Sequence, residues 1–362
     1  MEKILYLSPV DWDWIKQRPQ FLAEALCESY DMQVLYRKQY NRSGLQHNSP
    51  HNVLKIQGYR TLPSLCDRVR ASKSINSWLT RLAVKKALKK GEFDWIWITH
   101  PTQLVSLPKD VQPRIVYDCM DDYLEIGCQE NDRPWIFELE KTLCERANLV
   151  FASSIELKKR IESRYGLGEK VHLISNGCKW QESIKARSSD KCENDTFKIM
   201  YIGTISEWFD FNLIEESLKE IQDIEYELAG PINIETLPNH DRIKYCGVVP
   251  HEKLPEFVEH ADCLVMPFAR NSLVTAVDPV KLYEYISFRK NILCLGYPET
   301  EKFKEFACLY SNKQEYIEKL QGLMDNRELR YTGEDADRFL AENSWKNRAE
   351  QIKSLLNRDA TK

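Results

Sequence analysis

The chain alternates short apolar runs with longer amphipathic segments along almost its whole length, and this alternation most narrows the folds open to it. Lys3–Ser8 (KILYLS) and residues 94–99 (DWIWIT) are nearly continuously apolar, as the strands of a buried parallel sheet are. Segments with helical spacing lie between such runs, for example Ile155–Tyr165. This order of elements predicts an α/β chain with doubly wound parallel sheets.

A polar stretch at residues 179–195 (KWQESIKARSSDKCEND) interrupts this order, which resumes after it. A chain of 362 residues is long enough for two domains that each bury a core. We therefore expect two Rossmann-like domains that face a central cleft, over residues 1–180 and 196–340, with a linker at 181–195. Ligands of open α/β sheets bind at the carboxyl ends of the strands, which predicts a site in that cleft.

The composition excludes several classes of protein. With 43% hydrophobic and 29% charged residues the chain is an ordinary globular protein, and its net charge of −4 argues against a dedicated nucleic-acid binder. The eleven cysteines are scattered without a CxxC pair, which is typical of reduced thiols in a cytoplasmic protein and gives no support for a zinc site. The first apolar run is too short for a signal peptide, and no stretch has the length of a membrane span.

One candidate site lies in the second half, in the segment DPVKLYEY. Asp278 suits a helix N-cap and Pro279 the first helical position, so the start of this helix offers free N–H groups to a diphosphate. Lys281 adds a positive charge in the first turn, and Glu284 is placed to accept hydrogen bonds from a ribose diol. The alternative is an ordinary capped helix whose Lys281 and Glu284 form a solvated ion pair.

Two turns that directly follow strands support the interpretation of this helix start as a binding site for a diphosphate and a ribose. Gly203 and Thr204 directly follow the strand Phe197–Ile202, where a glycine lets the backbone approach a phosphate closely. The loop at 246–250 (CGVVP), with Val248 at its centre, follows another strand and offers backbone groups to a base edge. A plain βα turn explains that loop equally well.

The succession GTISEWFDF, YCGVVPHEKLPEFVEHADCLVMPF and DPVKLYEY resembles the nucleotide-sugar domain of GT-B glycosyltransferases. In the first half, SPVDWDWIKQRPQFLAEAL and YDCMDDY also resemble the teichuronic-acid-type subgroup of the large retaining family that builds bacterial polysaccharides. The resemblance therefore spans nearly the whole chain. It implies two domains of the GT-B fold, catalysis without a bound metal, and a last helix, within residues 341–362, that packs back on the N-terminal domain.

The resemblance also implies roles for single residues. It assigns ribose binding to Glu284, while the second glutamate that the family often carries eight residues earlier is Ala276 here. The Arg and Lys that many members place after the first glycine turn are missing from GTISE. We expect Arg270 and Lys281 to supply that charge to the diphosphate, with Arg18 reaching across from the other domain.

The first half holds a second set of candidates at the ends of strands. Trp12, Trp14 and Arg18 follow the first strand, and tryptophans with a cation suit stacking on a sugar ring and binding of phosphate; packing against the next helix is the alternative for either tryptophan. His100 follows the strand at 94–99 and is a candidate to contact the sugar or the reacting centre, or else a structural histidine. Asp118 is the first candidate of a carboxylate cluster and is expected to orient His100 or an acceptor hydroxyl.

Two further carboxylates, Asp121 and Asp122, follow Asp118 and are ranked below it, as caps of the next turn.

Residues 68–90 (RVRASKSINSWLTRLAVKKALKK) contain no acidic residue and have helical spacing of apolar side chains. Such a helix suits an anionic membrane surface, although a helix that packs on its sheet with solvated charges shows the same pattern. The residues expected to contact the membrane are Trp78, Arg81, Lys85, Lys86, Lys89 and Lys90.

These observations together predict a cytoplasmic glycosyltransferase, peripheral on the inner face of the cell membrane. It is expected to move a hexosyl unit from a UDP- or GDP-sugar to a hydroxyl of a polysaccharide or lipid-linked glycan, with retention implied by the resemblance. The expected catalytic residues are His100 and Asp118. Two alternatives remain: a nucleotide-sugar 2-epimerase of the same fold, and a non-catalytic scaffold of a glycan-assembly complex.

Overall fold

The computed structural model describes residues 1–8, 11–12, 16–39, 54–63, 70–126, 128, 130–179 and 196–360. It divides the chain into two compact units. Unit 1 comprises residues 1–176 and 345–362, and unit 2 comprises residues 177–344. The sequence analysis placed the boundaries near residues 180 and 340 instead, and the expected linker at 181–195 lies outside the described residues.

Unit 1 is built on a seven-stranded parallel sheet in the order β3-β2-β1-β4-β5-β6-β7. Alternate residues of its strands point into two separate cores, as the pleat requires: Leu5 and Leu7 of β1 face one, Ile4 and Tyr6 the other. The strands are β1 (Lys3–Ser8), β2 (Asp31–Arg37), β3 (Lys55–Tyr59), β4 (Trp95–Ile98), β5 (Arg114–Cys119), β6 (Leu149–Ala152) and β7 (Val171–Leu173).

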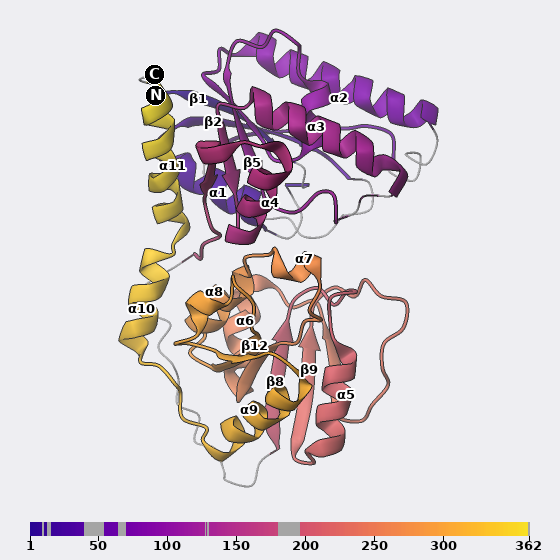
Figure 1. Cartoon of the computed structure of the whole chain (residues 1–362), viewed down its shortest axis with the longest axis vertical. Helices are drawn as coiled ribbons and strands as arrows, with labels where there is room; N and C mark the ends of the chain where they lie inside the picture. The colour runs from indigo at the N-terminus through magenta and orange to yellow at the C-terminus, as the bar shows by residue number, and fades with distance from the viewer. Residues whose placement is uncertain are drawn as a thin grey trace. The chain divides into compact units, whose positions relative to one another are not determined.

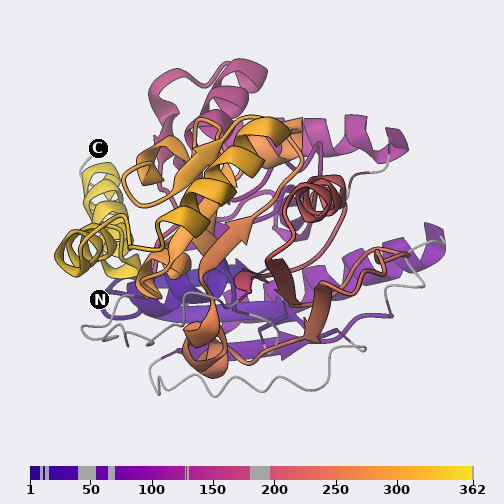
Figure 2. The same ribbon diagram turned by 90° about the horizontal axis from the view of Figure 1, so that it is seen from below.

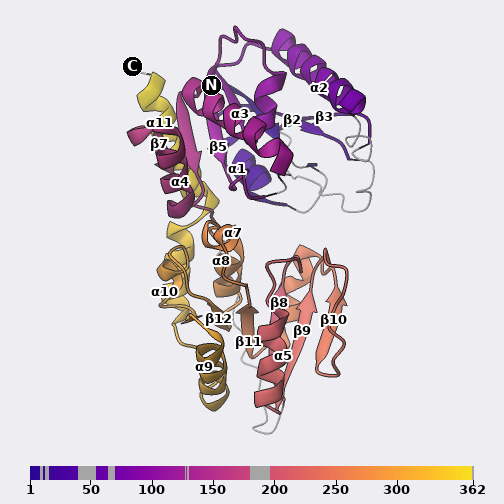
Figure 3. The same cartoon turned by 45° about the vertical axis from the view of Figure 1, so that its right-hand side comes forward.

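Helices cover both faces of this sheet (Figures 1 and 3). On one face α11 (Trp345–Ala360) packs on α1 (Arg18–Leu26), where the rings of Phe21 and Trp345 stack with centroids 5.5 Å apart. Both chain ends therefore lie on unit 1 (Figure 2). The helices of the other face are α2 (Arg70–Lys90), the 3-10 helix η2 (Pro101–Ser106), α3 (Arg133–Arg146) and α4 (Ile155–Tyr165).

Unit 2 repeats this design with a six-stranded parallel sheet in the order β10-β9-β8-β11-β12-β13. Figure 3 shows β8, β9 and β10 side by side. The strands are β8 (Phe197–Ile202), β9 (Ile224–Ala229), β10 (Ile243–Gly247), β11 (Cys263–Met266), β12 (Asn291–Leu295) and β13 (Cys308–Tyr310).

The helices of unit 2 pack in pairs: α5 against α9, and α8 against α10. Their apolar stripes and the sheet enclose one continuous core. The helices are α5 (Phe211–Glu220), α6 (Leu254–Phe257), α7 (Ser272–Thr275), α8 (Val280–Ser287), α9 (Lys313–Asp325) and α10 (Gly333–Glu342).

The strand order of each sheet reverses once, between β1 and β4 in unit 1 and between β8 and β11 in unit 2. Connections leave in opposite directions at such a point, which opens a crevice at the carboxyl ends of the two central strands. His100 follows β4 and Gly203 follows β8, so both candidates lie at the switch point of their own sheet.

Several expected elements differ in detail from the structure. The spacing of apolar residues over 251–260 predicts one helix, but the structure splits this segment into α6 and two flanking 3-10 turns. Pro255 accounts for this, because proline has no N–H to donate and its ring clashes with the carbonyl four residues earlier in an α-helix. The edge strand β13 was not predicted, since three residues are too few to show a period.

The large apolar side chains of α2 do not pack on the sheet, which was the alternative to a membrane contact for residues 68–90. Trp78 is 58% exposed, Ile75 45% and Leu82 44%. The face that packs on unit 1 carries smaller residues instead: Asn76, Val84 and Ala87.

No helix among the described residues is both long and apolar enough to cross a membrane. The nine cysteines within the described residues all carry free thiols.

Candidate active site

In unit 2 three neighbouring strands end in glycine at the same edge of the sheet. Gly203 follows β8, Gly230 follows β9 and Gly247 ends β10, and each has a positive φ. The Gly203 N–H donates to Ala229 O at 2.8 Å, and the Gly230 N–H donates to Gly247 O at 2.7 Å. A Cβ on Gly230 would collide with the carbonyl of Gly203. The backbone turns are therefore packed against one another at the edge where a ligand would bind.

Lys281 lies directly against the first of these turns. A Cβ on Gly203 would lie 2.7 Å from the Lys281 ammonium and 2.6 Å from the Tyr201 hydroxyl. Lys281 makes no hydrogen bond or ion pair within the described part of the chain. Burial lowers the pKa of Lys281, and Glu284 opposes that shift. The structure thus holds a half-buried lysine at the switch point, and an anion there would gain more from its ammonium than from a fully solvated lysine.

The helix that carries Lys281 begins one residue later than expected. Pro279 is the N-cap of α8, and no side chain caps the helix. The expectation that Asp278 caps it is wrong: the Asp278 carboxylate is fully buried and pairs with Lys302 at 2.6 Å. The N-cap residue itself therefore gives the first-turn N–H groups of α8 no side-chain acceptor, which suits a phosphate oxygen.

Glu284 has a partner that the sequence analysis did not single out. Its Oε1 lies 3.1 Å from Nε2 of His251, at the start of the segment after β10. Glu284 raises the pKa of His251, so the imidazolium form is favoured by this contact. The two side chains are 27% and 58% exposed, which leaves the carboxylate reachable by a ribose diol. The sequence did contain a signal for His251, because this histidine lies shortly after a strand, as His100 does.

The other expected donor residues of unit 2 are Arg270, Thr204 and Val248. Arg270 is exposed and donates to the Gly296 carbonyl at 2.6 Å, so one of its nitrogens is already engaged with backbone. The Thr204 carbonyl accepts from the Tyr201 hydroxyl at 3.0 Å. Val248 is 53% exposed on the loop after β10, where its backbone is open to a base edge.

In unit 1, His100 is the residue that the structure places most favourably. It is the N-cap of η2, and its Nδ1 accepts the backbone N–H of Thr102 at 3.2 Å and contacts Thr102 Oγ1 at 2.7 Å. Burial lowers the pKa of His100 to about 4. A neutral ring whose Nδ1 accepts a hydrogen bond carries its proton on Nε2, so His100 presents an N–H donor at neutral pH.

Asp118, which was expected to orient His100 or an acceptor hydroxyl, forms an ion pair with Arg18 instead. It is fully buried, and the Arg18 guanidinium holds it with two nitrogens, at 2.7 Å from NH2 and 3.2 Å from Nε. Arg18 also donates to Asn176 at 3.1 Å and is itself buried, so its expected reach to a diphosphate is wrong as well. A paired, desolvated carboxylate of this kind supports structure rather than proton transfer.

Asp121 is the carboxylate near this strand end that remains available. Its side chain makes no hydrogen bond or ion pair with any residue that the structure describes. Burial, with a smaller contribution from Asp122, raises the pKa of Asp121 to about 6, while Arg18 opposes the shift. Asp122 instead pairs with Arg160 and Arg164. From the sequence, Asp118 is expected to matter more than Asp121. The contacts of the two carboxylates in the folded chain reverse this expectation.

Two tryptophans, Trp12 and Trp14, were expected to stack on a sugar ring. Trp12 is 3% exposed and packs in the core beneath α1, so the expectation that it stacks on a sugar is wrong, and packing is its role. Trp14 lies outside the described residues.

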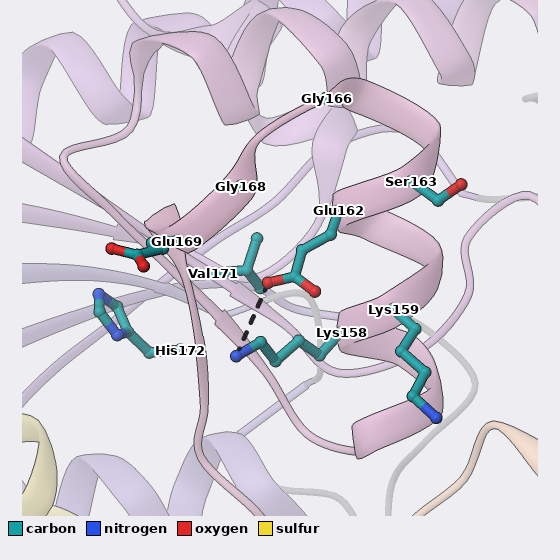
Figure 4. Close-up of a pocket in the computed structure, with 9 residues that line it drawn as sticks. All are labelled: Lys158, Lys159, Glu162, Ser163, Gly166, Gly168, Glu169, Val171 and His172. Atoms are coloured by element: carbon teal, nitrogen blue, oxygen red, sulfur yellow. Dashed lines mark ion pairs between the residues drawn. The ribbon is translucent and has the colours of Figure 1, made fainter.

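A surface hollow lies elsewhere on unit 1 (Figure 4). It is open and shallow, and the ion pair of Lys158 and Glu162 spans part of its wall at 3.7 Å. Its lining comes from the end of α4 and the start of β7, which is the amino edge of a parallel sheet. Because ligands of such sheets bind at the opposite edge, the hollow is not the candidate site.

Comparison with known proteins agrees with the fold and the motifs. No protein-family model matches the chain. The putative teichuronic acid biosynthesis glycosyltransferase TuaH of Bacillus subtilis (strain 168) is 24% identical over 236 residues, which cover 60% of this chain and 59% of that protein. The match thus spans well under two thirds of the length of this relative.

Solved structures match almost the whole chain. Sucrose-phosphate synthase from Thermosynechococcus elongatus has a TM-score of 0.75 at 14% identity and covers 99% of each chain. HepE from Anabaena, in complex with UDP-glucose, has a TM-score of 0.71 at 14% identity, over 99% of this chain and 100% of its own. The chain therefore has the GT-B fold of two Rossmann-like domains, and its predicted resemblance to teichuronic-acid-type glycosyltransferases is confirmed.

Proposed function

We propose that this chain is a hexosyltransferase that uses a nucleotide diphosphate sugar and a glycan or lipid-linked glycan hydroxyl as acceptor. The observation that carries the proposal is the half-buried Lys281 ammonium, which lies against the Gly203 turn and forms no ion pair with a described residue. HepE, which has the same fold, was solved with UDP-glucose, and this favours UDP over GDP as the nucleotide. Retention of anomeric configuration follows from the resemblance alone.

On the donor side, the proposed chemistry is stabilisation of the departing diphosphate. Lys281 and the uncapped N–H groups of α8 supply positive potential where negative charge develops as the sugar leaves. Glu284 accepts hydrogen bonds from the ribose diol, and His251 orients the Glu284 carboxylate. We expect no metal ion to be needed, because these groups supply the charge.

On the side of unit 1, His100 donates its Nε2–H to a hydroxyl of the transferred sugar or of the acceptor. Its Nδ1 is fixed by Thr102, so the ring needs no reorientation when substrate binds. Asp121, at the end of the neighbouring strand β5, is the carboxylate we assign to the acceptor hydroxyl in place of Asp118.

The experiment measures release of nucleoside diphosphate from a panel of UDP- and GDP-sugars, with and without a membrane extract as acceptor. The Lys281→Met variant is expected to lose donor binding by about tenfold to a hundredfold, as a charge-assisted contact is removed. Lys304→Met is the matched control, because Lys304 is an exposed lysine of the same unit whose side chain makes no hydrogen bond or ion pair within the described residues.

Each outcome separates the candidate functions. Release that needs the acceptor and fails in Lys281→Met supports transfer. Isomerisation of the sugar without acceptor supports the 2-epimerase instead. Failure of the wild-type protein to bind any donor leaves only the non-catalytic scaffold.

A further inference from the structure

The outward face of α2 is apolar in its first half and cationic in its second. Residues 75, 78, 82, 85 and 89 recur at intervals of three and four, so they form one stripe along the helix. The stripe consists of Ile75, Trp78, Leu82, Lys85 and Lys89, and all five are exposed. A helix normally turns such an apolar stripe toward the core, so its exposure here needs an explanation.

Packing within unit 1 does not explain the stripe. The opposite face of α2 already covers the sheet through Val84 and Ala87, which belong to the core of that side. The polar contacts of α2 also lie toward the protein: Asn76 holds the backbone of Leu62, and Arg81 donates to the Val105 carbonyl of η2 at 3.0 Å. In Figures 1 and 3 no described helix or strand of unit 1 lies over the outer side of α2.

The charges of this face are uncompensated. Lys85, Lys86, Lys89 and Lys90 are exposed, and none makes a hydrogen bond or ion pair with a described residue. The helix has no acidic residue, whereas lysines elsewhere on the surface commonly find one, as Lys158 does at Glu162. The outer side of α2 therefore presents a net positive charge next to a large aromatic ring.

We propose that this face of α2 lies on an anionic lipid bilayer, with Trp78 and its apolar neighbours in the interfacial region and the lysines at the headgroups. Tryptophan favours the headgroup level because its ring is apolar and its N–H is polar. Lysines near an anionic leaflet each contribute favourably, and their long stems let the ammonium reach the phosphates. A second copy that paired through the same face is a poorer occupant, because each α2 would bring its lysines to another α2 that has no acid to pair with them.

The inference goes beyond glycosyl transfer and does not depend on it. It is tested with the full chain by co-sedimentation with vesicles of phosphatidylcholine alone and of phosphatidylcholine with about one third phosphatidylglycerol. Binding is expected only to the anionic vesicles, and it should weaken as salt is added.

Two variants of the face and one matched control sharpen the test. Reversal of Lys85, Lys86, Lys89 and Lys90 to Glu is expected to reduce partitioning by at least about a hundredfold. Trp78→Ser with Leu82→Ser is expected to reduce it about tenfold through lost apolar contact. The control reverses four other exposed lysines, Lys109, Lys159, Lys304 and Lys346, and changes the net charge equally; it should bind almost as the wild type does.

Thermal unfolding of all variants checks that they fold, and changes should be small because every altered side chain is exposed. The proposal is overturned by wild-type protein that binds neither vesicle, by equal binding to both, or by a lysine-reversed variant that still binds. It is also overturned if the wild type forms a dimer that Trp78→Ser with Leu82→Ser abolishes, since a second copy then covers the face. We expect all these variants to bind the nucleotide sugar as the wild type does. Loss of vesicle binding with unchanged donor binding therefore tests the membrane contact separately from the proposed function.

Discussion

Gly203 and Lys281 are in such close contact that residue 203 has no room for a side chain: a Cβ there would lie 2.7 Å from the Lys281 ammonium. The turn after β8 and the first turn of α8 are thereby joined at the carboxyl edge of the second sheet. A side chain at residue 203 would therefore displace the Lys281 ammonium.

Gly203→Ala is expected to push Lys281 out of position and weaken nucleotide-sugar binding by about 1.5–3 kcal/mol, the range for a charge-assisted hydrogen bond. Gly166→Ala is the control, because Gly166 also has a positive φ but a Cβ there meets nothing within 4 Å. Both variants carry backbone strain, and calorimetric titration with UDP-glucose should separate them. Equal donor affinity in the two would contradict the diphosphate role of Lys281.

His251→Gln is expected to make donor binding less sensitive to pH. Glu284 raises the pKa of His251, so the ion pair is present below that pKa and is lost as the pH rises through it. Glu252 also raises the pKa of His251, and Lys179 lowers it. The wild-type KM for the donor should rise at alkaline pH by up to about fivefold, the range of an exposed pair, while the variant shows a flat profile. A variant that keeps the wild-type profile would remove His251 as a positioning residue.

Asp121→Asn is expected to stabilise the protein and slow the reaction. Burial raises the pKa of Asp121 to about 6, so its ionisation above that pH costs the folded state free energy that the unfolded state does not lose. At pH 7.5 the variant should be more stable by about 1–3 kcal/mol in urea unfolding. In the wild type, kcat should rise with pH through about 6 as the carboxylate forms. If kcat is unaffected by the substitution, Asp121 has no part in the reaction.

Asp118→Asn is expected to cost about 3–5 kcal/mol of stability, because it leaves the buried Arg18 guanidinium without its counter-charge. Glu2→Gln tests the contrast, since Glu2 pairs with Arg114 at the surface and its loss should cost at most about 1 kcal/mol. Urea unfolding of both variants measures the difference. Similar small losses would mean that the pair of Arg18 and Asp118 is not the support that its burial implies.

His100→Asn is expected to protect the protein against mild acid. The pKa of His100 is about 4 in the folded chain and 6.5 as the ordinary value, so stability present above pH 6.5 is lost as the pH falls toward 4. The loss amounts to about 2–3 kcal/mol. Asparagine still caps η2 by accepting the Thr102 N–H but does not titrate. Unfolding at pH 7.5 and 4.5 should show the stability gap between the two proteins closing or reversing at the lower pH.

The fold could be predicted well from the sequence because its signal is local. The runs of β1 and β8 are mostly apolar, and their bounds agree with those expected. β13 and the broken segment around Pro255 escaped prediction for opposite reasons: one is too short for a pattern, and in the other a helical pattern outweighed a proline.

The site was predicted in part. Lys281, Glu284 and His100 follow strands or begin helices, and chain position alone marks such residues. Asp118 and Trp12 have the same kind of position, yet one is neutralised by a residue a hundred positions away and the other is enclosed by the core. His251 was passed over because its partner, Glu284, is thirty-three positions away.

The sequence by itself determined the alternation of strands and helices, the two-domain α/β class and the acid-free stretch of α2, because these depend on neighbours along the chain. Only the tertiary structure decided which charged side chains form ion pairs and which do not. Pairing of Asp118 with Arg18, contact of Lys281 with Gly203 and exposure of Trp78 all depend on residues brought together by strand order. Electrostatic and burial free energies are set by distance in space, which the order of residues does not contain.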